Sequence, residues 1–89
     1  MISGPDGRCG VEAETRPTDL QALERRIALK ERDGDVACVI LLLLASAHNR
    51  ALMRAHGDAL AVRFPSSGRE VLARLARGRL PLANGIVLL

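Results

Sequence analysis

The sequence predicts a small α/β domain with the element order β-α-β-α-α-β. Three observations support this fold class. Residues 36–45 are apolar at every position, which is typical of a strand buried on both faces. Capping patterns mark a helix on either side of that run, and the chain ends in a second, shorter apolar run. The length of 89 residues suits one domain with a compact core.

The N-terminal residues 1–10 are rich in glycine and are predicted to form a flexible lead-in, so the domain itself is expected to span residues 11–89. A first strand is predicted from about Cys9 to Thr15. Within it, Glu12 and Glu14 alternate with smaller residues, so their carboxylates are expected to share one face.

A first helix is predicted after Pro17. Thr18 and Gln21 have the spacing of a capping box, and Asp19 places a favourable negative charge in the first turn. Gly34 is expected to end the helix in the left-handed conformation. The buried stripe is predicted to consist of Leu20, Leu23 and Ile27.

The apolar run 36–45 is predicted to be the central strand of the sheet. A right-handed crossover through the first helix would place it parallel to the first strand. A second helix is expected from about His48 to Arg63, with His56 on its apolar face and therefore packed or partly buried.

The C-terminal part of the chain is predicted to hold a short third helix and a last strand. Ser67 and Glu70 form a second capping box, and Gly78 is expected to end the helix. The last strand is predicted over 85–89. The buried residues of the third helix are expected to be Val71, Leu72, Leu75 and Ala76.

Composition excludes several classes of protein. Phe64 is the only aromatic residue, which argues against nucleic-acid recognition by base stacking. Cys9 and Cys38 follow no signal peptide, so free thiols in a reducing, cytoplasmic compartment are expected. The longest apolar run is about half of the ~20 residues that a membrane-spanning helix requires, and no membrane partner is expected.

Charge is distributed unevenly along the chain. Residues 1–35 carry eight acidic and six basic side chains, a net charge of −2, whereas residues 36–89 carry two acidic side chains and seven arginines, a net charge of +5. A basic half of this kind is suited to a polyanion such as DNA. Abundant arginine, alanine, glycine and leucine is equally typical of a GC-rich genome, so both interpretations remain open.

The segment from Ser46 to Arg50 follows the predicted central strand and begins the second helix, where backbone N–H groups can meet a phosphate. Asn49, Arg50 and Arg54 are therefore the candidate nucleic-acid contacts. Ordinary helix capping explains the same segment and is the favoured interpretation.

Glu12 and Glu14 are the only close carboxylate pair on a predicted strand. Such a pair is a candidate ligand set for Mg²⁺, which prefers oxygen ligands. The favoured interpretation is a solvated face of an edge strand, where charge also discourages pairing with another chain. His48 and His56 lack partners at zinc-ligand spacing.

A resemblance to a known family rests on several short segments taken together. Over about residues 9–89 the chain resembles the C-terminal part of a restriction-endonuclease-like domain of the PD-(D/E)xK type, as found attached to Cro/repressor-type helix-turn-helix regulators of actinobacteria. The segments that carry it are Val11 to Thr15, Asp19 to Gln21, Leu41 to Leu44, Asn49-Arg50, Phe64-Pro65, Gly68-Arg69 and Gly85 to Leu89.

The resemblance implies a partial nuclease-like sheet with flanking helices. In that fold an acidic residue on one strand and an E-x-K pair on the next bind a metal ion and position a water for attack on phosphate. Here Glu12 falls on the glutamate of the motif and Glu14 falls where lysine is expected. The strand that would carry the aspartate is expected upstream of Met1. The resemblance thus implies fold and origin more than activity, with no catalytic residue and no cofactor assigned.

Three functional hypotheses follow. The first is a degenerate or truncated, non-catalytic nuclease-like domain that serves as an interaction or regulatory module, with DNA or a helix-turn-helix protein as partner. The second is a metal-dependent nuclease half-site completed by another chain, with Glu12 and Glu14 as Mg²⁺ ligands and Arg50 or Arg54 near phosphate. The third is a structural domain that forms a homodimer through the unpaired edge of its first strand.

Overall fold

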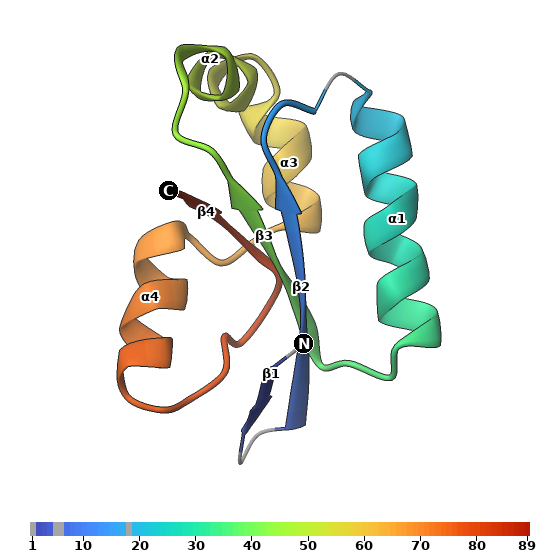
Figure 1. Cartoon of the computed structure of the whole chain (residues 1–89), viewed down its shortest axis with the longest axis vertical. Helices are drawn as coiled ribbons and strands as arrows, with labels where there is room; N and C mark the ends of the chain where they lie inside the picture. Colours follow the sequence, from blue (N-terminus) through green and yellow to red (C-terminus); the bar gives the residue numbers. More distant parts are fainter. Residues whose placement is uncertain (1, 5–6, 18) are drawn as a thin grey trace.

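The computed structural model describes residues 2–4, 7–17 and 19–89. This part of the chain is an α/β domain in which one mixed sheet of four strands carries four helices (Figure 1). The predicted α/β class is therefore confirmed, whereas the element order is β-β-α-β-α-α-α-β and not the predicted β-α-β-α-α-β, because a further strand precedes the first predicted strand and the predicted second helix is divided in two. None of the described helices is long and apolar enough to cross a membrane.

The strands are β1 (Ile2–Gly4), β2 (Gly7–Glu14), β3 (Cys38–Leu43) and β4 (Gly85–Leu88), and the helices are α1 (Leu20–Asp33), α2 (Ala47–Ala55), α3 (Gly57–Arg63) and α4 (Gly68–Ala76).

The strands lie in the order β1-β2-β3-β4. β1 is antiparallel to β2, while β2, β3 and β4 run parallel to one another. Cys9 lies opposite Cys38 and Glu14 lies opposite Leu43, so the predicted parallel pairing across α1 is confirmed. β3 lies between β2 and β4, as expected for the apolar run.

The N-terminal segment differs from the prediction. Where residues 1–10 are described they form β1 and the beginning of β2, with Ile2 opposite Cys9 and Gly4 opposite Gly7. Gly7 has a φ of 118°, a backbone conformation that residues with a side chain rarely adopt. Gly7 therefore serves the β1–β2 pairing instead of a flexible lead-in, because glycine adopts a positive φ without strain.

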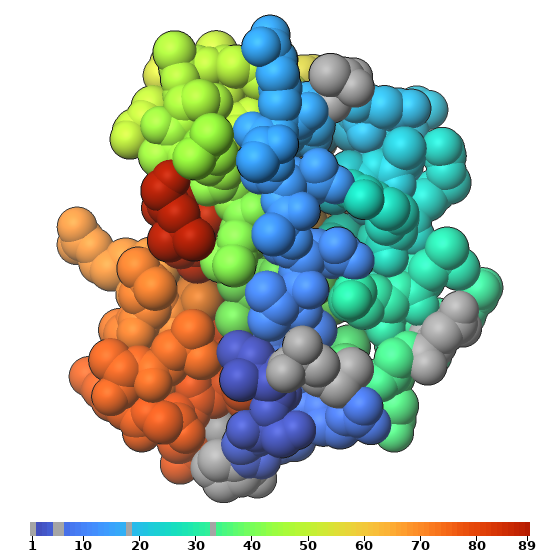
Figure 2. Space-filling view, in the orientation of Figure 1, coloured from blue at the N-terminus to red at the C-terminus, as the bar shows by residue number. Residues whose placement is uncertain are grey.

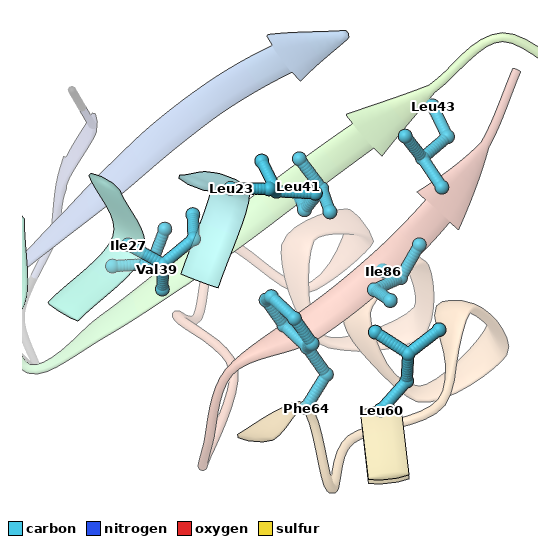
Figure 3. Close-up of a cluster of buried hydrophobic side chains, with 8 residues drawn as sticks. All are labelled: Leu23, Ile27, Val39, Leu41, Leu43, Leu60, Phe64 and Ile86. Carbon is cyan, nitrogen blue, oxygen red and sulfur yellow. The ribbon is translucent and has the colours of Figure 1, made fainter. Parts of the chain in front are cut away.

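β3 is apolar at every position because helices cover both of its faces. Successive side chains of a strand point to opposite faces. Val39, Leu41 and Leu43 lie in the cluster formed with α1 and α3, which Figure 3 shows. Its buried members are Leu23, Ile27, Val39, Leu41, Leu43, Leu60, Phe64 and Ile86. The α4 side has its own cluster of Cys9, Cys38, Ile40, Val71, Leu80 and Val87.

The ends of α1 are shifted by one residue from the prediction. Asp19 is the N-cap, and its Oδ1 accepts a hydrogen bond from Ala22 N at 3.1 Å. Thr18, the predicted cap, lies outside the described residues. Gly34 is helical, with a φ of −86°, and Asp35 takes the left-handed conformation with a φ of 50°. Aspartate is among the few residues that tolerate that conformation.

The predicted second helix is two helices, α2 and α3, that meet at His56. This residue has a φ of −119° and a ψ of 20°, so the helical backbone is interrupted there. His56 N donates to Leu52 O at 3.0 Å, and Leu60 N donates to His56 O at 2.9 Å. His56 is exposed, not packed as predicted. The following Gly57, a poor helix former, explains why the break falls here.

α4 begins and ends where predicted. Ser67 Oγ accepts a hydrogen bond from Glu70 N at 3.1 Å, and Gly78 has a φ of 71°. Its buried face is narrower than expected, since Val71 is fully buried while Leu72 is 51% exposed and Ala76 is exposed. The exposed Leu72 borders a groove described below.

Candidate functional site

Glu12 and Glu14 lie on the face of β2 that is turned toward α1. In the β2–β3 register Glu12 lies opposite Leu41 and Glu14 lies opposite Leu43, and both leucines belong to the cluster under α1. The predicted sharing of one face is therefore confirmed. The two carboxylates sit at the border of the hydrophobic core instead of on a fully solvated face.

Each carboxylate pairs with a basic side chain of α1. Lys30 Nζ lies 3.4 Å from Glu12 Oε1, and Arg26 Nη2 bonds to Glu14 Oε1. The geometry follows from chain spacing. Four residues of an α-helix span about 6 Å, and two residues of a strand span about 6.6 Å. Because α1 and β2 run in opposite directions, Lys30 and Arg26, four residues apart on α1, lie beside Glu12 and Glu14, two residues apart on β2. We call these four residues the β2–α1 ion-pair flank.

Gly10 makes room for the Lys30 side chain. A Cβ at this position would lie 2.8 Å from Lys30 Cδ, so the aliphatic stem of Lys30 crosses β2 over the glycine. Lys30 is the only lysine in the sequence. Sequence reasoning missed this contact because Gly10 was assigned to the flexible lead-in and Lys30 lies outside the predicted buried stripe of the first helix.

The ion-pair flank does not fit a Mg²⁺ ion by itself. Each carboxylate already has a cationic partner, and the described residues contain no group of three or more histidine, cysteine, aspartate and glutamate side chains suited to a metal. Mg²⁺ needs near-octahedral oxygen coordination, of which two carboxylates supply a small part. Further ligands would have to come from outside these residues.

Asn49 has a structural role. It is fully buried, and its Nδ2 donates to Thr15 O and to Leu44 O, both at 2.8 Å. Its backbone N–H donates to the N-cap Ser46 Oγ. The side chain therefore joins the segments that follow β2 and β3 to the first turn of α2. This burial corrects the expectation that Asn49 contacts nucleic acid.

Arg50 and Arg54 are exposed and lie one turn apart on α2. The structure leaves both accessible but does not bring them together with Asn49 at the surface. Their contact with a nucleic acid remains a prediction.

Cys9 and Cys38 are buried free thiols on neighbouring strands. Cys38 Sγ donates to Cys9 Sγ at 3.1 Å. Burial and the adjacent Cys38 thiol raise the pKa of Cys9 to about 12. Because the thiolate is the reactive form, Cys9 is poorly suited to nucleophilic chemistry.

The opposite edge of the sheet carries a groove that sequence reasoning missed. It has a volume of about 490 Å³ and lies among α3, the first turns of α4 and strand β4. We call it the β4 groove. Its apolar lining comes from Met53, Leu60, Phe64, Leu72, Ile86 and Leu88, and Arg69 contributes the charged side chain of the lining. These residues come from separate segments of the chain, and the sequence predicted Leu72 to be buried, so no local signal indicated the groove.

Comparison with protein-family models, with curated proteins and with solved structures gives no significant match.

Proposed function

We propose that this chain is a degenerate nuclease-like α/β domain that acts as a non-catalytic interaction or regulatory module for DNA-associated transcription regulators. The observation that carries the proposal is the ion-pair flank. In an E-x-K site the carboxylate binds a divalent cation and the lysine stabilises charge at the phosphate. Here Glu12 is paired with Lys30, and Glu14, in the position of that lysine, is paired with Arg26.

The order of elements around the flank supports the same proposal. A hairpin leads into β2, α1 follows, and β3 returns parallel beside β2. The resemblance implies an acidic residue on the strand before the E-x-K pair. That strand is expected upstream of Met1, but here β1 precedes β2 and its residues Ile2–Gly4 include no acidic side chain. The resemblance thus supports a nuclease-like origin, while β1 and the charges of the flank favour a role other than cleavage.

The missing ligands are a larger obstacle to catalysis than the ion pairs. Partly exposed pairs contribute about 0–1 kcal/mol each, so a cation could displace Lys30 and Arg26 at small cost. The coordination of that cation would still lack most of its oxygen ligands. A half-site completed by another chain therefore requires the second chain to supply them.

A cleavage assay tests the proposal. The purified chain is incubated with supercoiled and linear duplex DNA in millimolar Mg²⁺ or Mn²⁺, and we expect no cleavage. Glu14→Lys restores the charge of the motif and is also expected to be inactive, since one lysine does not provide metal ligands. Glu14→Gln is the matched control. Metal-dependent cleavage by the unmodified chain that disappears in Glu12→Gln would overturn the proposal in favour of the half-site.

Light scattering identifies the class of partner. The mass of the chain is measured with and without a short DNA duplex at low salt. A mass unaffected by DNA agrees with a protein partner. A salt-sensitive complex that is lost when Arg50 and Arg54 are both changed to glutamate would make DNA itself the partner of the module, because phosphate contacts weaken as salt rises.

A further inference from the structure

The β4 groove is an apolar hollow of about 490 Å³ that lies along the β4 edge of the sheet. Figure 2 shows the C-terminal residues (dark red) reaching the surface between the α2 segment (yellow-green) and the α4 segment (orange). Leu72 and Leu88 are 51% and 36% exposed. Apolar side chains at a concave sheet edge favour a binding site over a plain surface.

The outer edge of β4 offers backbone groups for pairing. Leu89 N donates to Leu43 O, and Ala45 N donates to Leu89 O, so Leu89 faces the β3 side. In a parallel strand the N–H and C=O of alternate residues point to opposite sides. Leu88 therefore directs its N–H and C=O away from β3. Within the described chain no strand lies on that side of β4.

The chain already pairs with this edge at one point. Ser66 N donates to Asn84 O at 2.9 Å, and Ser66 forms an isolated parallel bridge with Gly85. The pairing stops there because Ser67 caps α4 and the backbone turns into the helix. Gly68 stays close to the edge, since a Cβ there would lie 2.9 Å from Ile86 O. The outer edge of β4 can therefore form parallel backbone hydrogen bonds, and the described chain leaves the N–H and C=O of Leu88 open to such pairing.

The charge of the groove lining indicates which kind of partner the groove would bind. Arg69 lines the groove and is exposed, and residues 36–89 carry seven arginines against the two acids Asp58 and Glu70. Glu70 is engaged with Ser67 in the cap of α4. A second copy that docked through the same groove would bring its own Arg69 toward this one, and the like charges would repel. A partner with carboxylates is complementary.

We propose that the β4 groove binds an extended, acidic and apolar peptide segment of a partner protein by strand addition to β4. Its backbone pairs with Leu88, its apolar side chains enter the groove beside Leu72, and a carboxylate pairs with Arg69. Strand addition of this kind takes its affinity from backbone hydrogen bonds and its specificity from side-chain pockets. The inference rests on the proposed function as an interaction module and names its binding surface.

The test uses two labelled peptides, one of alternating valine and glutamate and one with lysine in place of glutamate. Binding to the full chain is measured by fluorescence anisotropy and mapped by the amide NMR shifts of the ¹⁵N-labelled protein. We expect the acidic peptide to bind at least about tenfold more tightly than the basic one, because the charged side chain of the groove lining is Arg69. Shifts are expected at Leu88, Gly68 and Arg69.

Two variants with matched controls locate the contacts. Leu88→Pro removes the outward N–H and leaves the β3–β4 hydrogen bonds, whereas Leu88→Ala retains the donor. Arg69→Glu reverses the charge in the groove, and Arg77→Glu makes the same change at the far end of α4. We expect Leu88→Pro and Arg69→Glu each to weaken binding about tenfold and the controls to change it less than about twofold. Arg69→Glu keeps the test decisive if the proline variant fails to fold.

Equal affinity for both peptides, or shifts confined to another face, would overturn the inference. A concentration-dependent dimer that Leu88→Pro abolishes would make a second copy the occupant and would also overturn it. Failure of the peptide test without metal-dependent cleavage leaves the proposed function standing with a different surface. Metal-dependent cleavage by the unmodified chain would instead overturn the proposed function itself.

Discussion

The two flanks of the sheet differ in how their chemistry is used. On the β2–α1 ion-pair flank, Glu12 and Glu14 are each paired with a cation from the same domain. At the β4 groove, Arg69 and exposed leucines lie beside a strand edge that, in the described chain, pairs on its outer side only through the Ser66 bridge. The flank that carries the carboxylate pair is internally neutralised, and the flank without such a pattern is the one proposed to bind a partner.

This difference shows why a motif and a site need not coincide. The ion-pair flank has a sequence pattern because its residues are close along one strand. The groove has no pattern because its lining comes from separate helices and a strand. Function depends on the side chains that remain available to a partner, and these need not lie on the strand that carries the pattern.

The largest expected effect is at Gly85, where β4, the Ser66 bridge and α4 meet. A Cβ there would collide with Val71 Cγ2 and lie 2.9 Å from Ser66 O. We expect Gly85→Ala to lower the free energy of unfolding by about 2–3 kcal/mol through overpacking, measured by urea denaturation. Gly57→Ala, with no atom within 4 Å of its Cβ, is the control. A neutral Gly85→Ala would mean that the packing of Val71 and Ser66 against β4 is loose enough to accept a methyl group.

The second effect is at Asn49, between the two flanks. Asn49→Ala leaves Thr15 O and Leu44 O without their side-chain donor, and we expect a loss of about 2 kcal/mol of stability by the same measurement. Exposed Arg50→Ala on the same helix turn is the control. A stable Asn49→Ala variant with weakened DNA binding would contradict the structural role and restore Asn49 as a nucleic-acid contact.

The third effect is a pH dependence of the free energy of unfolding caused by Cys9, which lies in the buried cluster between the sheet and α4. Its pKa is raised from 9.0 to about 12 in the folded chain, so folding favours the protonated thiol. The resulting stability is fully present below pH 9 and is lost as the pH rises toward 12. We expect the stability difference between the unmodified chain and Cys9→Ala to shrink across that window. A stability difference that does not change with pH would show that the Cys9 thiol ionises as easily in the folded chain as in the unfolded chain.

The smallest effect is expected from the ion pairs. A double-mutant cycle of Glu14→Gln with Arg26→Gln should give a coupling of about 0.3–1 kcal/mol that disappears in molar salt, since both side chains are partly exposed. Glu31 and Arg63, 3.4 Å apart, provide a reference cycle. A coupling of several kcal/mol would show that the ion-pair flank is a major source of stability. Selection for stability alone would then explain the pairing of Glu12 and Glu14, without a loss of nuclease activity.

The parts of the fold that depend on local signals were predictable. The apolar run gave β3 and its central position, and the Ser67 and Glu70 pair with Gly78 gave both ends of α4. The break at His56 was not foreseen because the apolar periodicity continues across it. β1 was missed because glycine predicts flexibility and tight turns alike, and only pairing with β2 distinguishes them.

The candidate site was predictable only in part. Alternation along the first strand placed Glu12 and Glu14 on one face, which the structure confirms. Their partners Arg26 and Lys30 depend on how α1 lies across β2, which no local pattern encodes. The burial of Asn49 likewise depends on carbonyl groups of two other segments.

The most direct test of the contrast between the flanks is a Mg²⁺ titration of the ¹⁵N- and ¹³C-labelled chain, following the amide and side-chain carboxyl NMR signals of Glu12 and Glu14. Pairing with Lys30 and Arg26 and the shortage of further ligands predict only small, non-saturating shifts at millimolar Mg²⁺. Saturable shifts of both carboxyl signals that are lost in Glu12→Gln would contradict the account and identify the ion-pair flank as a metal site.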